Sequence, residues 1–423
     1  MSSTDQYLSP EQLCIGLYIH LDLPWMDHPF TFSSFKIKDE EQLDKVRRLG
    51  LKQIRYSPDK SDLAPPVPMP AADPVHTPQP LPMPPQEDEV AVAAKRARIA
   101  KLEAHRQAMV QCEKAFGSAA QTVRSLEKNI HARPKEAVAA ADQLVDGMLD
   151  SLLTDKDIAI HLMSDRTAGE DIYYHSLNVS VLSLTLAKEL QLSRGDIHIL
   201  GLAALLHDVG KREVPDKILL KTDTLTRAEQ SILEQHVQWS LAAAQKAGLV
   251  GPVLEVIGQH HEMCDGSGYP ARLKQAAIHP VARVLGLINV FDNLCNAANP
   301  AQSMTPHEAL AYMFAQQRSK YDAPVMSTFI RCMGVYPPGS VVMLSNDAFA
   351  LVVSVNSSRP LKPQVLVYEP DVPREEAVVI DLEEESDLNI SKALKPNQLP
   401  RAAAEYLNPR KRQTYYFDAK EKK

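Results

Sequence analysis

The sequence predicts a mainly α-helical chain with a small α/β or β-rich module at its N-terminal end and a small β-rich extension at its C-terminal end. Apolar residues recur at every third or fourth position from Pro134 to about Gly334, which is the period of a helix. Short runs of alternating apolar and polar residues lie before and after this stretch. Alternation of this kind is typical of half-buried strands.

The N-terminal region combines strand-like runs with an aromatic stretch. LCIGLYIHL and QIRY predict strands, and we expect a regulatory module over residues 1–62. Residues 63–90 contain APPVPMPAADPVHTPQPLPMPPQ, which is dominated by proline. Because proline fixes φ and has no amide hydrogen, neither a helix nor a central strand can form there. We expect an extended linker.

A long helix is predicted after the linker. Residues 91–133 are rich in Ala, Lys, Arg, Glu and Leu, with apolar positions at helical spacing. We expect an interruption near Gly117. The helix suits dimerisation or signal relay, and packing against its own domain is an equally good interpretation.

The helical domain is expected over residues 134–336. Its helices should break at Gly195, at Val214 to Pro215 and at Gly251 to Pro252. After Pro337 the runs GSVVMLSNDAFALVVSVNS and PQVLVYEP predict a β-meander. We assign residues 337–423 to a C-terminal β-rich extension.

Composition excludes several classes of protein. The chain has 423 residues and a formal net charge of -7, which argues against a nucleic-acid polymer as partner. It contains neither a signal peptide nor an apolar run of membrane-spanning length, so we expect a cytoplasmic protein without a membrane partner. The five cysteines never form a CxxC pair, so neither a disulfide framework nor a zinc knuckle is indicated.

A group of histidines breaks the helical pattern. In LLHDVGK an apolar helix ends at His207 and Asp208, and burying an unpaired imidazole and carboxylate costs several kcal/mol. A divalent metal would offset that cost. Four more histidines interrupt apolar stretches in the same way: His175, His236, His260 and His261. One such histidine is usually a hydrogen-bonded core residue, but five with an aspartate favour a site for iron, manganese or zinc.

Other polar residues near this group receive separate interpretations. Asp171 lies four residues before His175 and shares its helix face. The remaining histidines of the helical region are assigned to helix starts or exposed faces, without partners at ligand spacing: His161, His198, His279 and His307.

The order of these motifs resembles that of a known family. His175, the pair His207 and Asp208 with Lys211, His236, the pair His260 and His261, and DGSGYP follow one another as in the HD-GYP family, a branch of the HD phosphohydrolases that hydrolyses cyclic dinucleotides. The resemblance covers roughly residues 165–320. In addition, LSPEQLCIGLYIHLDLPWMDHPFTFSSFKI looks like the small domain of unknown function that precedes many HD-GYP domains in proteobacteria.

The resemblance implies an HD-type helical bundle that holds two or three divalent metal ions, with iron or manganese favoured. The implied ligands are His175, His207, Asp208, His236, His260 and His261. Asp208 would bridge two ions. Asp171 stands where members with three metals carry a glutamate. Lys211 matches the lysine that approaches the scissile phosphate, so Lys211 and Asp208 are the expected catalytic residues.

Two positions depart from the family pattern. The usual metal-binding aspartate is replaced by Asn289, which can still ligate through its carbonyl oxygen but brings no charge. Asp292 matches a second acidic position, whose side chain usually contacts a metal ligand and not the metal itself. Most members also carry a basic run that grips the substrate, and here the matching stretch is AANPA, residues 297–301.

The glycine-rich loop after the paired histidines is open to two interpretations. Its residues are Asp265, Gly266, Gly268, Tyr269 and Pro270. Glycine permits backbone conformations that are closed to other residues, and proline fixes the exit of the loop. The loop is either a tight connection between helices or, as the resemblance implies, the rim of the site and a docking surface for a GGDEF-type cyclase.

The sequence and the resemblance together predict hydrolysis of cyclic di-GMP to linear pGpG, and onward to GMP, in bacterial second-messenger signalling. Cyclic GMP-AMP is the second candidate substrate. A different class of function is a catalytically weak module that senses the nucleotide or recruits a partner; Asn289 and the missing basic run favour it. A third is an HD phosphohydrolase acting on mononucleotides or alarmones, against which DGSGYP counts. The long helix makes a homodimer reasonable.

Overall fold

The computed structural model describes residues 6–23, 28, 30, 33–62, 89–154, 159–163, 171–356, 359–370, 372, 374, 377, 379–385, 387–409 and 413–417. It divides the chain into two compact units, Met1–His105 with Val367–Val378 and Arg106–Leu366 with Val379–Lys423. Residues 63–88 of the predicted linker lie outside the described part. The domain boundaries expected from the sequence remain a proposal.

The first unit contains a small antiparallel sheet with strand order β1-β4-β2-β3. Its elements are β1 (Gln6–Leu8), η1 (Pro10–Gln12), β2 (Tyr18–His20), β3 (Ser34–Lys36), α1 (Glu40–Arg48), β4 (Ile54–Tyr56) and η3 (Pro58–Lys60). Asp39 caps α1 by accepting a hydrogen bond from the amide of Gln42. The core side chains include Leu17, Ile19 and Val46. These contacts make a self-contained β-rich module.

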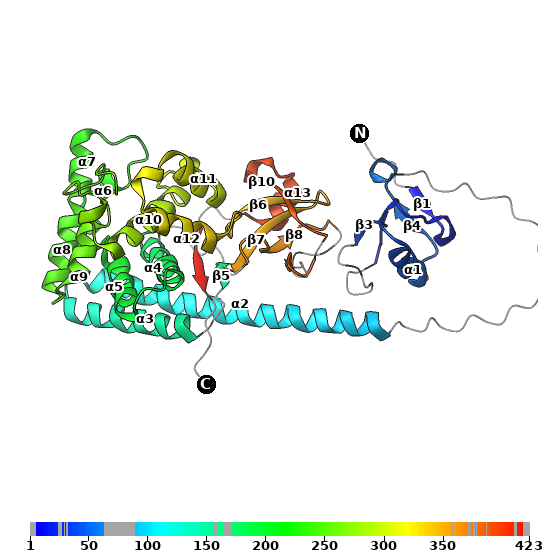
Figure 1. Cartoon of the computed structure of the whole chain (residues 1–423), viewed down its shortest axis with the longest axis horizontal. Helices are drawn as coiled ribbons and strands as arrows, with labels where there is room; N and C mark the ends of the chain where they lie inside the picture. Colours follow the sequence, from blue (N-terminus) through cyan, green and yellow to red (C-terminus); the bar gives the residue numbers. More distant parts are fainter. Residues whose placement is uncertain are drawn as a thin grey trace, which may run out of the picture. The chain divides into compact units, whose positions relative to one another are not determined.

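The second unit is mainly helical (Figure 1). Helix α2 (Glu89–Asn129) belongs to this unit from Arg106 onward. The other helices of the unit are α3 (Pro134–Thr154), α4 (Asp171–Glu189), α5 (Arg194–Leu206), η4 (Val209–Glu213), α6 (Asp216–Leu219), α7 (Arg227–Glu234), α8 (His236–Lys246), α9 (Pro252–Gln259), η5 (Gln275–Ala277), α10 (Pro280–Cys295), η6 (Pro300–Gln302), α11 (Pro306–Gln316), η7 (Arg318–Lys320) and α12 (Ala323–Met333). Helix α4 packs against α5 and α10, and α5 packs against α9. No described helix has the length and apolar composition to cross a bilayer.

Helix α2 corrects one expectation. It runs without interruption through Gly117, where a break was predicted. Glycine costs a helix interior about 1 kcal/mol relative to alanine, and burial of Phe116, Ala119 and Val123 on one face of the helix offsets that cost.

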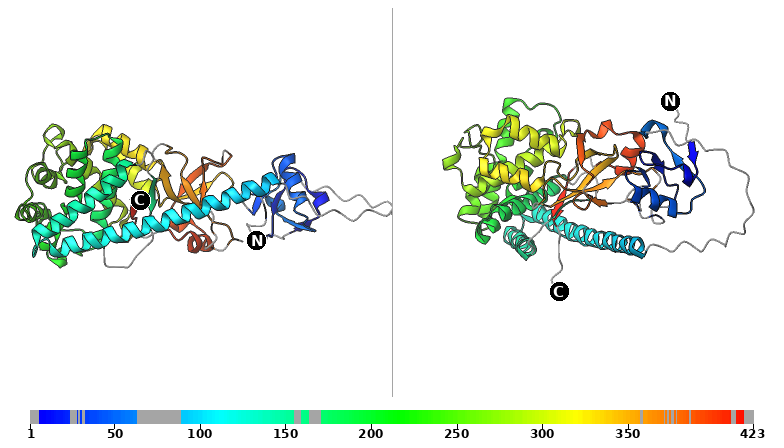
Figure 2. Two further views of the ribbon diagram at one scale, coloured as in Figure 1. Left: turned by 90° about the horizontal axis from the view of Figure 1, so that it is seen from below. Right: turned by 45° about the vertical axis from the view of Figure 1, so that its right-hand side comes forward.

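The C-terminal β-rich part is a larger sheet than the predicted meander. Its elements are β5 (Ala159–Leu162), β6 (Val341–Leu344), β7 (Phe349–Asn356), β8 (Gln364–Val367), β9 (Val379–Asp381), β10 (Ile390–Leu394), η9 (Pro396–Gln398), α13 (Arg401–Leu407) and β11 (Tyr415–Phe417). The main path of the sheet is β10-β6-β7-β5-β11. Both views of Figure 2 show its orange and red strands beside the green and yellow helices.

Strand β5 lies inside the stretch expected to be entirely helical, and that expectation is wrong there. β5 pairs with β7 on one side and with β11 on the other, so it joins the last strand of the chain to the sheet. The predicted fold class is nevertheless confirmed: the chain is mainly helical, with a small β-rich module before the helices and a β-rich sheet after them.

Gly210 allows η4 and α8 to approach each other closely. A Cβ atom at this position would lie 2.3 Å from the carbonyl oxygen of His236 and 2.4 Å from the amide nitrogen of Ser240. Instead, the amide of Gly210 donates a hydrogen bond to Ser240 Oγ at 2.9 Å. This contact between η4 and α8 brings Asp208 next to His236.

Candidate metal centre

Asp208 lies at the centre of two groups of potential metal ligands. One group contains Asp208, His236, His260 and His261, and the other contains His175, His207 and Asp208. Asp208 and three of the histidines, His207, His236 and His260, are completely or almost completely buried. Asp208 belongs to both groups, so its carboxylate is placed between them.

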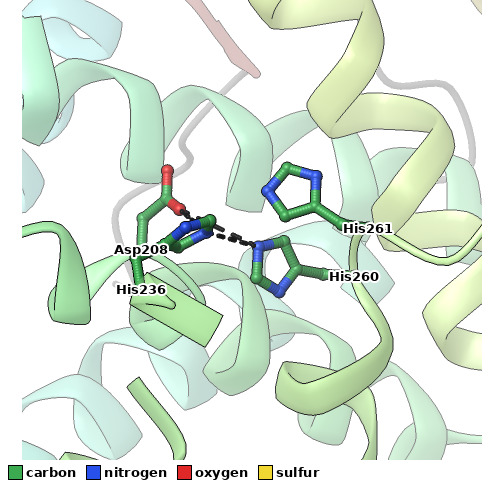
Figure 3. Close-up of side chains that lie close together, drawn as sticks. All are labelled: Asp208, His236, His260 and His261. Carbon is green, nitrogen blue, oxygen red and sulfur yellow. Dashed lines mark hydrogen bonds and ion pairs between the residues drawn. The ribbon is translucent and has the colours of Figure 1, made fainter. Parts of the chain in front are cut away.

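The first group surrounds Asp208 Oδ1 (Figure 3). His236 Nε2 lies 3.3 Å from this oxygen and His260 Nε2 lies 3.8 Å from it. The two Nε2 atoms are 3.3 Å apart. The ring of His261 lies against the ring of His260, with centroids separated by 4.1 Å. The imidazoles of His236 and His260 thus lie close to one carboxylate oxygen, and His261 completes the group.

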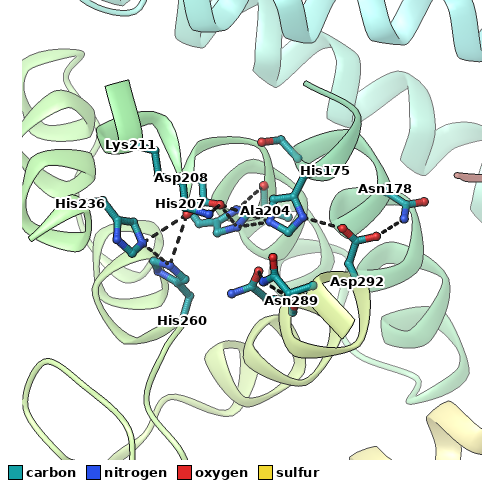
Figure 4. Close-up of polar contacts among 12 residues, drawn as sticks. His175, Asn178, Ala204, His207, Asp208, Lys211, His236, His260, Asn289 and Asp292 are labelled. Atoms are coloured by element: carbon teal, nitrogen blue, oxygen red, sulfur yellow. Dashed lines mark hydrogen bonds and ion pairs between the residues drawn. The ribbon is translucent and has the colours of Figure 1, made fainter. Parts of the chain in front are cut away.

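The second group surrounds Asp208 Oδ2 (Figure 4). His175 Nε2 lies 3.2 Å from this oxygen, and His207 Nε2 lies 3.3 Å from it. These two Nε2 atoms are also 3.3 Å apart. Lys211 Nζ forms an ion pair with the same oxygen. The two carboxylate oxygens of Asp208 therefore face different sets of side chains.

Hydrogen bonds to the backbone fix the tautomers of three histidines. Each donates its Nδ1 proton to the carbonyl oxygen three residues earlier: His207 to Ala204 at 2.8 Å, His236 to Leu233 at 2.6 Å and His260 to Ile257 at 2.6 Å. A neutral ring with its proton on Nδ1 carries a lone pair on Nε2. The lone pairs therefore point toward Asp208 and toward one another.

This arrangement of lone pairs fits a cation. Asp208 Oδ1 and His261 Nε2 are buried and have no hydrogen-bond partner among the described residues. Lone pairs of imidazole and carboxylate at this spacing repel unless a positive ion lies among them. Imidazole and carboxylate ligands without thiolate suit iron, manganese or zinc. The buried imidazole and carboxylate groups are therefore suited to hold divalent metal ions.

The ionisation of the cluster agrees with ligand chemistry. Burial lowers the pKa of His207, His260 and His261, so these rings stay neutral at neutral pH. Burial acts to raise the pKa of Asp208, but the charge of Lys211 and the hydrogen bond with His175 outweigh burial and hold that pKa well below its ordinary value. These are the protonation states in which the side chains bind metals.

His175 differs from the other histidines. Burial opposes its charged form, but hydrogen bonds to Asp208 and Asp292 outweigh burial and raise the pKa of His175 to about 9. Its Nδ1 proton is donated to Asp292 Oδ2 at 2.6 Å. His175 must therefore release a proton before its Nε2 can bind a metal.

The structure places Asn289 and Asp292 on the same helix, α10. Both are buried. Asn289 Oδ1 accepts a hydrogen bond from Asn293 Nδ2 at 2.9 Å, whereas Asn289 Nδ2 has no partner among the described residues. Asp171 begins α4, but its side chain lies outside the described part of the chain. The metal-binding roles of Asn289 and Asp171 remain proposals.

The glycine-rich loop is fixed against the paired histidines. The rings of Tyr269 and His261 stack with centroids 4.5 Å apart, and the Tyr269 amide donates to the His261 carbonyl at 3.1 Å. A Cβ at Gly268 would lie 2.4 Å from that carbonyl oxygen. The buried carboxylate of Glu262 accepts hydrogen bonds from the amides of Ala271 and Leu273, at 2.6 and 2.7 Å.

The remainder of the predicted loop is built by local contacts. Asp265 Oδ1 accepts hydrogen bonds from the amide and hydroxyl of Ser267, at 2.9 and 2.6 Å. Gly266 has a φ of 82°, which favours glycine. The bond between Tyr269 and Pro270 is cis. These contacts hold the loop in one conformation beside His261.

Sequence reasoning missed Glu127 on α2. Its side chain is buried, and burial first and then the charge of Asp208 raise the pKa of Glu127 to about 7. Ser176 Oγ donates to its carboxylate at 3.4 Å. A sequence signal existed: Glu127 interrupts the buried stripe that contains Val123 and Ile130.

Two of the histidines given ordinary roles also require correction. His161 is a buried residue of β5, not a residue of a helix start or an exposed face. His198 has partners, because its Nε2 lies 3.1 Å from Asp142 Oδ1 and 3.8 Å from Asp146 Oδ1. These partners belong to a different helix, so spacing along the chain could not reveal them.

Comparison with known proteins adds the family. Family models match three segments: an HD domain over residues 148–325, a domain of unknown function over residues 6–141, and a KOW domain associated with the HD domain over residues 341–402. A cyclic di-GMP phosphodiesterase of Pseudomonas aeruginosa is 30% identical over 366 residues, which cover 84% of this chain and 83% of that protein. The chain belongs to the HD-GYP family.

Other relatives match a smaller share of the chain. The cyclic di-GMP phosphodiesterase response regulator RpfG of Xanthomonas campestris is 34% identical over 147 residues, which are 34% of this chain and 39% of that protein. The 3'3'-cGAMP-specific phosphodiesterase 1 of Vibrio cholerae is 34% identical over 160 residues, which are 38% of this chain and 37% of that protein. Relatives of this HD-GYP protein therefore include enzymes named for two different cyclic dinucleotides.

Proposed function

We propose that this HD-GYP protein hydrolyses cyclic di-GMP to linear pGpG, and onward to GMP, in bacterial second-messenger signalling. The carboxylate of Asp208, which faces imidazole nitrogens on both of its oxygens, carries the proposal. The extent of the match with a cyclic di-GMP phosphodiesterase supports it, since 83% of that protein is covered. The relatives named for cyclic GMP-AMP make that nucleotide the second candidate substrate.

The residues that would hold the metal ions follow from the two groups. His236, His260 and His261 would bind one ion, His175 and His207 would bind a second, and Asp208 would bridge them. Asn289 and Asp171 are the proposed additional ligands, and Asp171 would serve a third ion. Two divalent ions of iron or manganese would activate water and offset negative charge on the phosphate.

Lys211 has a separate proposed task. Its side chain is one-fifth exposed, and its ammonium group pairs with Asp208 Oδ2. The same oxygen faces His175 and His207. A cation bound at this oxygen would compete with the ammonium group. We propose that Lys211 then pairs with a non-bridging phosphate oxygen of the substrate, whose negative charge grows during the displacement.

A pocket beside the glycine-rich loop supports a guanine-containing substrate. It has a volume of about 500 Å³. Tyr269 and Arg272 line it from the side of the loop, and Glu234 and Gln238 line it from the junction of α7 and α8. Guanine offers acceptors at O6 and N7 that suit arginine, and its N1 and N2 donors suit a carboxylate. Tyr269 lines this pocket, and its ring also stacks against His261.

Arg272 is the residue of this pocket whose replacement should affect substrate binding most. It adopts a φ of 56°, which costs a non-glycine residue roughly 1 kcal/mol. We expect Arg272→Ala to raise the KM for cyclic di-GMP about tenfold or more, since a good bidentate contact to guanine is worth ~1–3 kcal/mol. Steady-state kinetics should show an unchanged kcat, and elemental analysis should show an unchanged metal content. Lys246→Ala, on the exposed end of α8, is the control. If both variants had the same KM, the substrate would not bind in this pocket.

Two sequence features favour a second candidate, a catalytically weak module that senses the nucleotide or recruits a partner. Asn289 brings no charge to the centre, and residues 297–301 contain no basic side chain. In this alternative the glycine-rich loop docks a GGDEF-type cyclase. A homodimer through α2 is compatible with either function.

The deciding experiment measures turnover with defined metals. The purified protein is loaded in turn with manganese and with ferrous iron, and is incubated with cyclic di-GMP and with cyclic GMP-AMP while the products are separated by chromatography. Linear product that is absent from metal-free protein and from His236→Ala establishes the phosphodiesterase and ranks its substrates. Nucleotide binding without turnover under every metal condition would instead establish the sensor.

A further inference from the structure

We propose that the C-terminal segment from Gln413 to Tyr415 positions the metal ligand His175 through two buried asparagines and Asp292. This inference rests on the proposed metal centre and concerns control of that centre. The segment leads into β11, which is the last strand of the sheet and pairs with β5. Tyr415 of this segment is 237 residues distant in sequence from Asn178, one of the two asparagines.

Asp292 uses both of its oxygens. Oδ2 accepts the Nδ1 proton of His175 at 2.6 Å. Oδ1 accepts hydrogen bonds from Asn178 Nδ2 and from Asn296 Nδ2, the latter at 2.9 Å. Because the carboxylate is buried, its orientation depends on these donors. The two asparagines therefore determine how Asp292 faces His175. Figure 4 shows Asp292 between His175 and Asn178.

The same asparagines bind the backbone of the C-terminal segment. Asn178 Oδ1 accepts a hydrogen bond from the Tyr415 amide at 2.7 Å, and Asn296 Oδ1 accepts one from the Gln413 amide at 2.7 Å. Both side-chain amides also donate to the Gln413 carbonyl oxygen, at 3.3 and 2.9 Å. Each asparagine thus has its amide held from both ends, so neither can turn over without losing contacts.

The consequence for the metal centre follows from the chemistry of histidine. A partner that accepts the Nδ1 proton fixes the ring and leaves Nε2 as the metal ligand. For His207, His236 and His260 that partner is a carbonyl of the preceding helical turn, which the fold supplies locally. For His175 the partner is Asp292, and the orientation of Asp292 depends on a segment from the end of the described chain.

Helix α2 contacts the strand that continues this segment. Cys112 Sγ donates to the Phe417 carbonyl oxygen at 3.4 Å, and the rings of Phe116 and Tyr416 lie 5.9 Å apart, edge to face. A displacement of α2 would therefore act on β11 as well as on α4, where the ring of Phe116 stacks on Tyr174, the residue before His175. This makes β11 a route by which α2 can alter the group of ligands that contains His175.

The test measures metal affinity in the full-length protein. We expect Asn178→Ala and Asn296→Ala each to weaken binding of manganese by about tenfold, the lower end of the range for residues that orient metal ligands. Competition with a chelator gives the affinity, and thermal unfolding of the metal-free proteins gives stability. The control is Ser183→Ala, which lies on α4 with Asn178 and whose hydroxyl is buried without a partner among the described residues.

A substitution in the segment itself separates positioning from general destabilisation. Gln413→Pro removes the amide proton that Asn296 accepts, and we expect it to weaken manganese binding as the asparagine variants do. Unchanged affinity in all three variants, whatever happens to the unfolding temperature, would overturn the proposal. Should Gln413→Pro not fold, the single asparagine variants decide the question. His207→Ala tests the metal centre itself, since manganese binding equal to that of the wild type in this variant would refute the centre, not its positioning.

Discussion

Replacing Asp208 with alanine is expected to abolish hydrolysis of the cyclic dinucleotide and to remove the metal ions. Asp208 is the only residue shared by the two groups of potential ligands in the described part of the chain, so its loss affects both. Its oxygens lie 3.2 to 3.8 Å from four Nε2 atoms. We expect kcat to fall at least roughly 10³-fold, since one preorganised electrostatic contact alone is worth about 10²–10³.

The measurement combines product chromatography with elemental analysis of the purified protein. Asp223→Ala is the matched control, because Asp223 is exposed in the segment before α7. Asp208→Asn keeps the shape of the side chain but loses its charge, and should retain less metal than the wild type. Full metal content together with normal turnover in Asp208→Ala would show that the reaction takes place elsewhere.

Lys211→Met is expected to lower kcat by about 10²-fold while the metal content stays unchanged. The substitution removes an ammonium group that we assign to the phosphate and not to the metals, and charge stabilisation by a single positioned group is worth about this much. Lys211→Arg should recover part of the activity, because it restores the charge in a different shape. Single-turnover kinetics with manganese-loaded protein measure the effect.

The control for this prediction is another paired lysine. Lys221 forms an ion pair with Glu229 at 2.6 Å, and neither residue belongs to the metal centre. Lys221→Met should turn over like the wild type. If Lys211→Met lost its metals, Lys211 would be a structural counter-ion of Asp208, and its proposed contact with the phosphate would be wrong.

The histidine cluster is the part of the site that sequence indicates best. Its members are chemically out of place in apolar helices, and this conflict is visible without a structure, as at His207 and Asp208. The structure brings both residues together with His175, His236, His260 and His261. Helical periodicity predicts most of the helices for a similar reason, because the apolar face of a helix is visible in the spacing of nearby residues.

Contacts between distant segments are the part that sequence does not indicate. Asn178 and Asn296 read as ordinary polar residues, and their importance depends on the backbone of Gln413 and Tyr415, which only the folded chain brings near. Strand β5 was missed because four residues are too few to show a period. It forms a strand because it pairs with β7 and β11, which are distant in sequence.

The continuity of α2 limits how this protein can vary during evolution. Cys112, Phe116, Val123 and Glu127 lie on one face of the helix and are buried in the second unit. An α-helix turns by about 100° per residue, so inserting or deleting one residue between Phe116 and Glu127 would rotate one of them away from its neighbours. Changes of about seven residues, close to two full turns, would preserve the register. Length variation in this stretch should therefore be found in steps of whole turns.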